Sequence, residues 1–131
     1  MKGFVEDIED LAEQNENFRQ VLYTGQHLQL VLMSLDPDEE IGDEVHKDRD
    51  QFFRIEKGKG QIVIDGKTQK VKSGDAIVVP AGSLHNLINT GGKALKLYTL
   101  YGPPNHRDQL IQRTKAEAIN SHEKFAGATT E

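Results

Sequence analysis

The chain has 131 residues, with 16 lysines and arginines against 21 aspartates and glutamates, and a net charge of -5 at pH 7. This length is typical of a single core, so we expect residues 1–131 to form one domain. The absence of a basic patch argues against nucleic acid as a partner, and the absence of cysteine excludes disulfides and thiolate ligands. The longest apolar run, Leu30–Leu35, is too short to span a membrane, and residues 1–10 lack the apolar segment of a signal peptide. We therefore expect a cytoplasmic protein without a membrane partner.

The first part of the chain predicts a short helix followed by two strands. Residues 5–17 carry apolar side chains at a helical spacing on a very acidic background. Residues 18–23 and 28–35 are rich in β-forming side chains, and the second of these runs ends at an Asp-Pro-Asp turn. An edge strand as apolar as 18–23 would favour association, so we expect it to be an exchanged or edge-pairing element between chains.

The middle of the chain predicts many short strands separated by glycine turns. The expected strands are 52–56, 61–65, 69–71, 76–79, 85–89 and 95–101. Asp65-Gly66 is the dipeptide expected of a two-residue hairpin turn. Strands at intervals of about ten residues favour an antiparallel sandwich or barrel.

The last part of the chain predicts one helix after the strands end. Pro103-Pro104 closes the strand pattern, and Thr114 with Glu117 forms a capping-box arrangement that begins a helix running to about Lys124. Its apolar face is thin, so we expect it to lie on the outside of the barrel or against a second subunit. Residues 127–131 have nothing to bury, and we expect them to be frayed.

The segment 74–89 has the most informative spacing of glycine, proline and histidine in the chain. Gly74 permits a tight turn, the β-branched run that follows predicts a buried strand, and Pro80 with Gly82 redirects the chain so that His85 begins the next strand. The positions of Gly74, Pro80, Gly82, His85 and Asn89 match the pattern G-x5-P-x-G-x2-H-x3-N, and in this the chain resembles the cupin superfamily. The resemblance implies an all-β fold, a small antiparallel barrel of the double-stranded β-helix or jelly-roll type, and a homodimer.

A second segment, residues 42–58, matches the other cupin pattern, G-x5-H-x-H-x4-E-x6-G, only in outline. Aligning Gly58 and His46 puts Glu44 where the family has its first histidine and Gln51 where it has its glutamate. Fifteen residues, 59–73, separate the two segments, which is similar to the spacing of small single-domain cupins, including those described as mannose-6-phosphate isomerase-like.

The resemblance implies one divalent metal ion bound by Glu44, His46, Gln51 and His85. Glu44 and His46 are two residues apart and share one face of an extended chain, whereas Gln51 needs a break within 47–50 to point the same way. Two imidazoles and a carboxylate suit Zn, Mn, Fe, Co or Ni, and the residues do not decide between them. A buried carboxylate also favours a cation beside it.

A rival ligand set lies on one face of an unbroken strand through the same segment. It consists of Glu44, His46, Asp48 and Asp50. We rank this set second, because three crowded carboxylates would require a harder cation than paired histidines indicate.

Two further residues are candidates for catalysis at such a site. His106 follows the proline pair and would act as a general acid or base over the barrel mouth, and Tyr101 has the parity to reach the cavity. The resemblance implies a metal-binding barrel that acts on a small polar metabolite, as a sugar or sugar-phosphate isomerase. A non-haem iron dioxygenase with the same ligands and a non-catalytic binding or sensing domain are the alternatives.

Overall fold

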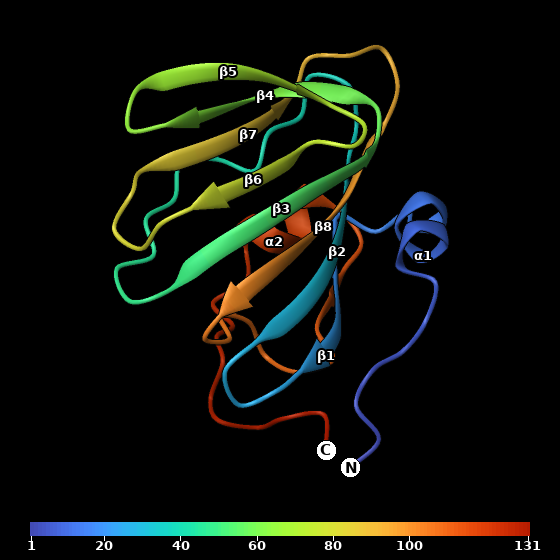
Figure 1. The fold of residues 1–131 in the computed structure, drawn as a ribbon, viewed down its shortest axis with the longest axis vertical. Helices are drawn as coiled ribbons and strands as arrows, with labels where there is room; N and C mark the ends of the chain where they lie inside the picture. The colour runs from blue at the N-terminus through green and yellow to red at the C-terminus, as the bar shows by residue number, and fades with distance from the viewer.

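The computed structural model describes residues 1–131 and consists of two antiparallel sheets with a short helix towards each end of the chain (Figure 1). One sheet has the strand order β6-β3-β8-β2-β1-β9, and the other has the order β5-β4-β7. The elements are α1 Ile8–Gln14, β1 Arg19–Thr24, β2 Gln29–Leu35, β3 Asp50–Lys57, β4 Lys59–Ile64, β5 Lys67–Lys72, β6 Ala76–Val79, β7 His85–Asn89, β8 Leu95–Gly102, β9 Ile111–Gln112 and α2 Lys115–Ile119. The small antiparallel β-barrel expected from the sequence is confirmed.

The core fills the space between the sheets with side chains at alternate strand positions. On β3, Gln51, Phe53 and Ile55 are buried, and on β8 the same holds for every second residue from Leu95 to Tyr101. The largest apolar members of this core are Phe53, Tyr101, Met33, Leu35, Ile55, Ile62, Leu87, Leu95 and Leu97. Gln51 is the cross-strand neighbour of Tyr101 on β8, so an amide and a phenol lie side by side at this end of the core.

Two glycines have the turn and packing roles that the strand pattern requires. Asp65 and Gly66 both have positive φ, 46° and 83°, which is the geometry of the predicted two-residue hairpin. Gly60 lies on β4 where β7 approaches closely, and a Cβ there would be 2.3 Å from the carbonyl oxygen of Ile88. The two strands therefore pack at a distance that only glycine permits.

The C-terminal helix is shorter than predicted. Thr114 is the N-cap and accepts a hydrogen bond from the Glu117 amide, but α2 ends at Ile119, with Asn120 as C-cap. Beyond it the chain crosses the barrel mouth, and the Phe125 amide donates to the carbonyl of Asn105. The helical spacing was present in the sequence, but packing of residues 121–125 against the barrel mouth replaced the remaining turns.

The prediction that residues 18–23 form an edge strand was wrong, because β9 covers β1. Residues 111–112 form β9, a two-residue strand that pairs with Arg19 and Gln20, and the Val21 amide donates to the carbonyl of Leu110. The N-terminal helix is confirmed in position, and it packs against the outside of β2, β3 and β8 with Ala12 buried.

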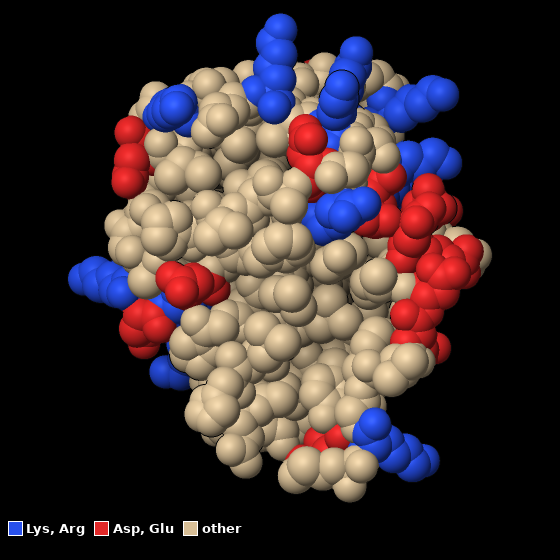
Figure 2. All heavy atoms as spheres, viewed as in Figure 1, with Lys and Arg blue, Asp and Glu red and all other residues tan.

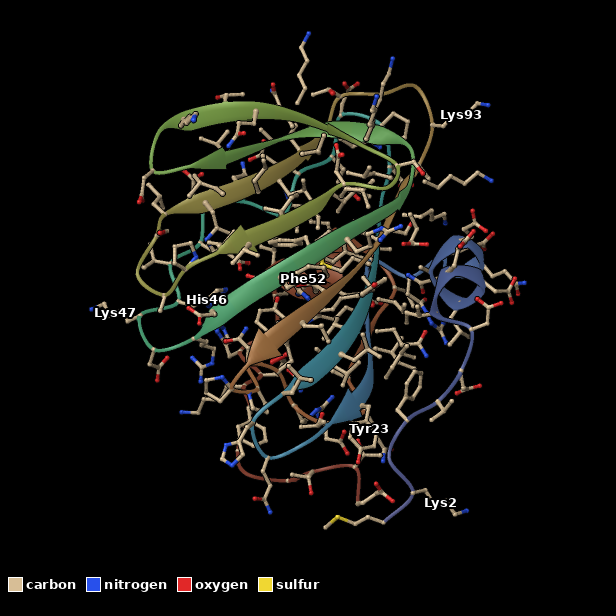
Figure 3. The ribbon with its side chains drawn as sticks, in the orientation of Figure 1. Lys2, Tyr23, His46, Lys47, Phe52 and Lys93 are labelled. Atoms are coloured by element: carbon tan, nitrogen blue, oxygen red, sulfur yellow. The ribbon has the colours of Figure 1, made fainter.

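Charge is unevenly distributed on the surface. Figure 2 shows acidic side chains gathered over α1 and basic side chains projecting from the end of the molecule where β4, β5 and the loop with Lys93 lie. An uncharged band crosses the face between them, in the region where Figure 3 labels Phe52. None of the helices is long and apolar enough to cross a membrane.

Candidate metal centre

Glu44, His46 and His85 come together at the open end of the barrel. The ligand atoms of all three side chains lie within 4.8 Å of one another. Glu44 forms an isolated antiparallel bridge with His85, in which each amide donates to the other's carbonyl at 2.9 and 3.0 Å. This backbone pairing places the two side chains beside each other before any side-chain contact is made.

His46 is held beside this pair by a backbone hydrogen bond to Gly82, and its ring contacts both Glu44 and His85. Its carbonyl accepts a hydrogen bond of 2.9 Å from the Gly82 amide, its Nε2 lies 3.0 Å from Glu44 Oε2, and its ring centroid is 5.5 Å from that of His85. After His46 the chain turns at Lys47 and Asp48, and Lys47 points away from the molecule in Figure 3. The break expected within 47–50 is therefore present, and β3 begins beyond it.

Gln51 projects into the same space from β3. It is 3% exposed, and its Nε2 donates to Thr99 Oγ1 at 3.0 Å, while that hydroxyl donates to the carbonyl of Phe52 at 2.8 Å. With its amide oriented in this way, Gln51 directs Oε1 at His85 Nε2, 3.1 Å away.

The other ring nitrogen of His85 determines what this contact means. Nδ1 lies 3.0 Å from the carbonyl oxygen of Ser83, to which it can only donate. A neutral His85 then has a lone pair on Nε2, and this lone pair faces the lone pairs of the Gln51 oxygen in a buried site. Two acceptors at hydrogen-bond distance repel each other unless a proton or a cation lies between or beside them. The residues therefore fit a bound metal ion on the chemistry of their donor atoms.

The electrostatics of Glu44 favour its charged form. Burial by itself would raise the pKa of this carboxyl, but the hydrogen bond with His46 and the positive charge of Arg19 outweigh it and lower the pKa below its ordinary value. The Glu44 side chain is 29% exposed and that of His46 is 13% exposed, so the site opens to solvent while His85 and Gln51 form its buried wall.

The two candidate catalytic residues are in direct contact with each other. Tyr101 is 1% exposed, its hydroxyl lies 3.1 Å from His106 Nε2, and its ring packs edge-on against that of His46 at 5.7 Å between centroids. Burial raises the pKa of Tyr101, and burial lowers the pKa of His106. At neutral pH the phenol is therefore protonated and the imidazole is neutral.

Glu123 completes this pair and was missed in the sequence. Its Oε1 lies 2.7 Å from His106 Nδ1, and both side chains are 10% exposed. Gln29 positions the His106 backbone, accepting from its amide at 2.9 Å and donating to its carbonyl at 2.8 Å. The sequence placed Glu123 within the predicted helix that runs to about Lys124, whereas α2 ends at Ile119 and the chain beyond it brings Glu123 to His106. No local pattern marks such a contact.

The rival ligand set does not assemble. Asp48 pairs with Arg49 at 2.9 Å, and its side chain is 74% exposed. Asp50 accepts a hydrogen bond of 2.9 Å from the Ala81 amide. Both carboxylates are therefore occupied away from Glu44 and His46, because the turn at 47–48 ends the unbroken strand that this set required.

Comparisons with known proteins identify the domain to which this chain belongs. Residues 31–101 match the model of the cupin domain. The chain is 49% identical over 125 residues to the uncharacterised protein YrkC of Bacillus subtilis, covering 90% of this chain and 67% of that protein. It is 44% identical over 108 residues to the uncharacterised protein L612 of Acanthamoeba polyphaga mimivirus, covering 79% of this chain and 67% of that protein.

Two solved structures superimpose on this chain. BH2720 of Bacillus halodurans superimposes with a TM-score of 0.90 at 41% identity, over 92% of this chain and 96% of that one. A predicted oxalate decarboxylase of Thermotoga maritima superimposes with a TM-score of 0.56 at 25% identity, over 57% of this chain and 65% of that one. The chain belongs to the cupin family.

Proposed function

We propose that this cupin barrel binds one divalent metal ion through Glu44, His46 and His85, with Gln51 as a further oxygen donor, and acts on a small polar metabolite. The observation that carries the proposal is the convergence of the Glu44, His46 and His85 ligand atoms within 4.8 Å of one another, with the Gln51 amide 3.1 Å from His85 Nε2.

A metal ion bound here would act as a Lewis acid on a substrate carbonyl or hydroxyl. Beside it, Tyr101, His106 and Glu123 form a route for a proton. Tyr101 receives a proton from the substrate on its phenol oxygen while its own proton passes to His106 Nε2, 3.1 Å away. The imidazolium formed is stabilised by the Glu123 carboxylate, which lies 2.7 Å from Nδ1.

Return of the proton to a different atom of the substrate completes an isomerisation, so an isomerase acting on a sugar-like hydroxycarbonyl compound is the first proposal. A dioxygenase is the second, because two histidines and one carboxylate also form the donor set of non-haem iron oxygenases. The name of the Thermotoga maritima relative adds decarboxylation of a small carboxylic acid to the reactions worth assaying.

Elemental mass spectrometry of protein purified without chelators tests metal binding. We expect stoichiometric metal in the wild type and in His122→Ala, whose histidine is exposed, and loss of metal in His85→Ala. Wild-type protein that holds no metal after reconstitution with each candidate ion would refute the proposal.

Exchange of substrate hydrogen with deuterated water tests the proton route in metal-loaded protein. Across a panel of hydroxycarbonyl compounds, we expect exchange in the wild type and a loss of about 100-fold or more in Tyr101→Phe. Oxygen consumption without exchange would favour the dioxygenase instead. If the loaded protein supports neither exchange nor oxygen uptake, the barrel binds its ligand without catalysis.

We also propose that the chain forms a homodimer through the outer face of the six-stranded sheet. Val78, Phe52, Leu100 and Leu30 are cross-strand neighbours on this face, Val78 is 66% exposed, and no charge interrupts the band in Figure 2. Light scattering of wild type and Phe52→Asp at micromolar concentration tests this, with a monomeric wild type as the refuting result.

A further inference from the structure

Arg19 is a buried cation without an anionic partner. It is 6% exposed and faces the barrel interior from β1, in the cross-strand row with Met33. Its Nη1 donates to Gln112 Oε1 at 2.7 Å and its guanidinium lies 5.2 Å from the Phe18 ring centroid, but it takes part in none of the ion pairs of the structure. A buried charge in such surroundings costs free energy unless an anion comes to it.

The guanidinium has a free donor that these contacts leave unused. Arg19 Nε is shielded from solvent and has no hydrogen-bond acceptor. Glu123 Oε2 is likewise shielded from solvent and has no hydrogen-bond donor, because only Oε1 of that carboxylate is bonded to His106. An unsatisfied donor and an unsatisfied acceptor are each rare in a folded protein.

Both groups line one pocket of about 180 Å³ at the barrel mouth. Gln112, Asn105 and His106 contribute further polar walls, and Lys124 adds a second cation at its rim. The pocket has room for a small polar group rather than for a whole sugar phosphate.

The pocket lies close to the metal centre. His106 lines the pocket and its Nε2 lies 3.1 Å from the Tyr101 hydroxyl, and the Tyr101 ring packs against the His46 ring at 5.7 Å between centroids. The Tyr101–His106 pair therefore connects the pocket with the metal centre.

We propose that this pocket binds the carboxylate of a small hydroxycarboxylic acid, with Arg19 as the residue that recognises it. The carboxylate would face the Arg19 guanidinium and the neighbouring hydroxyl would face the Glu123 carboxylate, so one ligand would match the charge of both walls of the pocket. This inference deepens the proposed function, on which it rests, by naming the substrate class of the same site.

Isothermal titration with glycolate tests the pocket, using acetate, glycolamide and inorganic phosphate as probes that lack the hydroxyl, the negative charge and the carboxylate respectively. We expect glycolate to bind more tightly than all three to the metal-loaded protein. Arg19→Met should weaken glycolate binding by about 10-fold to 100-fold, and Arg19→Lys should weaken it too, because lysine keeps the charge but lacks the Nε donor. Arg107→Met, which removes an exposed arginine, is the matched control and should bind as the wild type does.

The same titrations in protein treated with chelator separate this inference from the metal proposal. Glycolate binding that depends on Arg19 in chelator-treated protein would support the pocket whatever the metal content of the reconstituted protein, and absence of metal after reconstitution would refute the metal centre alone. Full metal content with no glycolate binding, or with binding unchanged in Arg19→Met, would overturn the pocket alone. Tighter binding of phosphate would overturn the assignment to a carboxylate, and equal binding of acetate would overturn the role of Glu123.

Discussion

Metal binding should stabilise the folded chain by an amount that can be calculated, since the ligands are assembled only when β7 and the 44–46 segment are paired. At a free metal concentration 100 times the dissociation constant, the gain is about 2.7 kcal/mol. For 131 residues the entropy of unfolding is about 0.28 kcal/mol per kelvin, so the melting temperature should rise by roughly 10 °C.

Differential scanning fluorimetry of chelator-treated protein with zinc, manganese or nickel measures this shift. His85→Ala removes the ligand whose Nε2 faces Gln51, and we expect it to lose nearly the whole shift. His122→Ala, in which the imidazole is exposed, should keep it. A wild-type shift below about 2 °C at saturating metal, or an equal shift in His85→Ala, would refute the assignment of these ligands.

Two further predictions concern packing and pH. Gly60→Ala should lower the free energy of unfolding by about 1–3 kcal/mol, because the added Cβ would be 2.3 Å from the Ile88 carbonyl oxygen. At Gly92 an added Cβ would have no atom within 4 Å, so Gly92→Ala should change this free energy little. Urea titrations measure both. Burial lowers the pKa of His106 below its ordinary 6.5, so the unfolded chain takes up a proton first as the pH falls. The free energy of unfolding should therefore decrease as the pH falls below about 7. The variant His106→Gln should flatten that decrease, and the control His122→Gln should not. An unchanged pH dependence in His106→Gln would contradict the burial of this imidazole.

The strands around the site could be predicted because local chemistry determines them. Gly74, Pro80 and Gly82 have specific turn roles, and the strand at His85–Asn89 has the predicted bounds. The burial of Gln51 followed from its alternation with Phe53, which needs only the period of a strand.

The parts that were missed depend on contacts between distant residues. The two residues of β9 are too few to show a period, so its pairing with Arg19 left no trace in the sequence. Glu123 reaches His106 only because α2 ends early, and the length of a short helix is decided by packing rather than by propensity. That Arg19 Nε and Glu123 Oε2 lack hydrogen-bond partners can be seen only when the neighbours of each atom are known.

The reciprocal backbone hydrogen bonds between Glu44 and His85 fix the position of residue 44 without depending on its side chain. Any residue at position 44 would still be held opposite position 85, since the amides and carbonyls that pair them are common to all residues except proline. A substitution at position 44 would therefore change the donor atom offered beside His85 while the backbone bridge and the barrel stay in place.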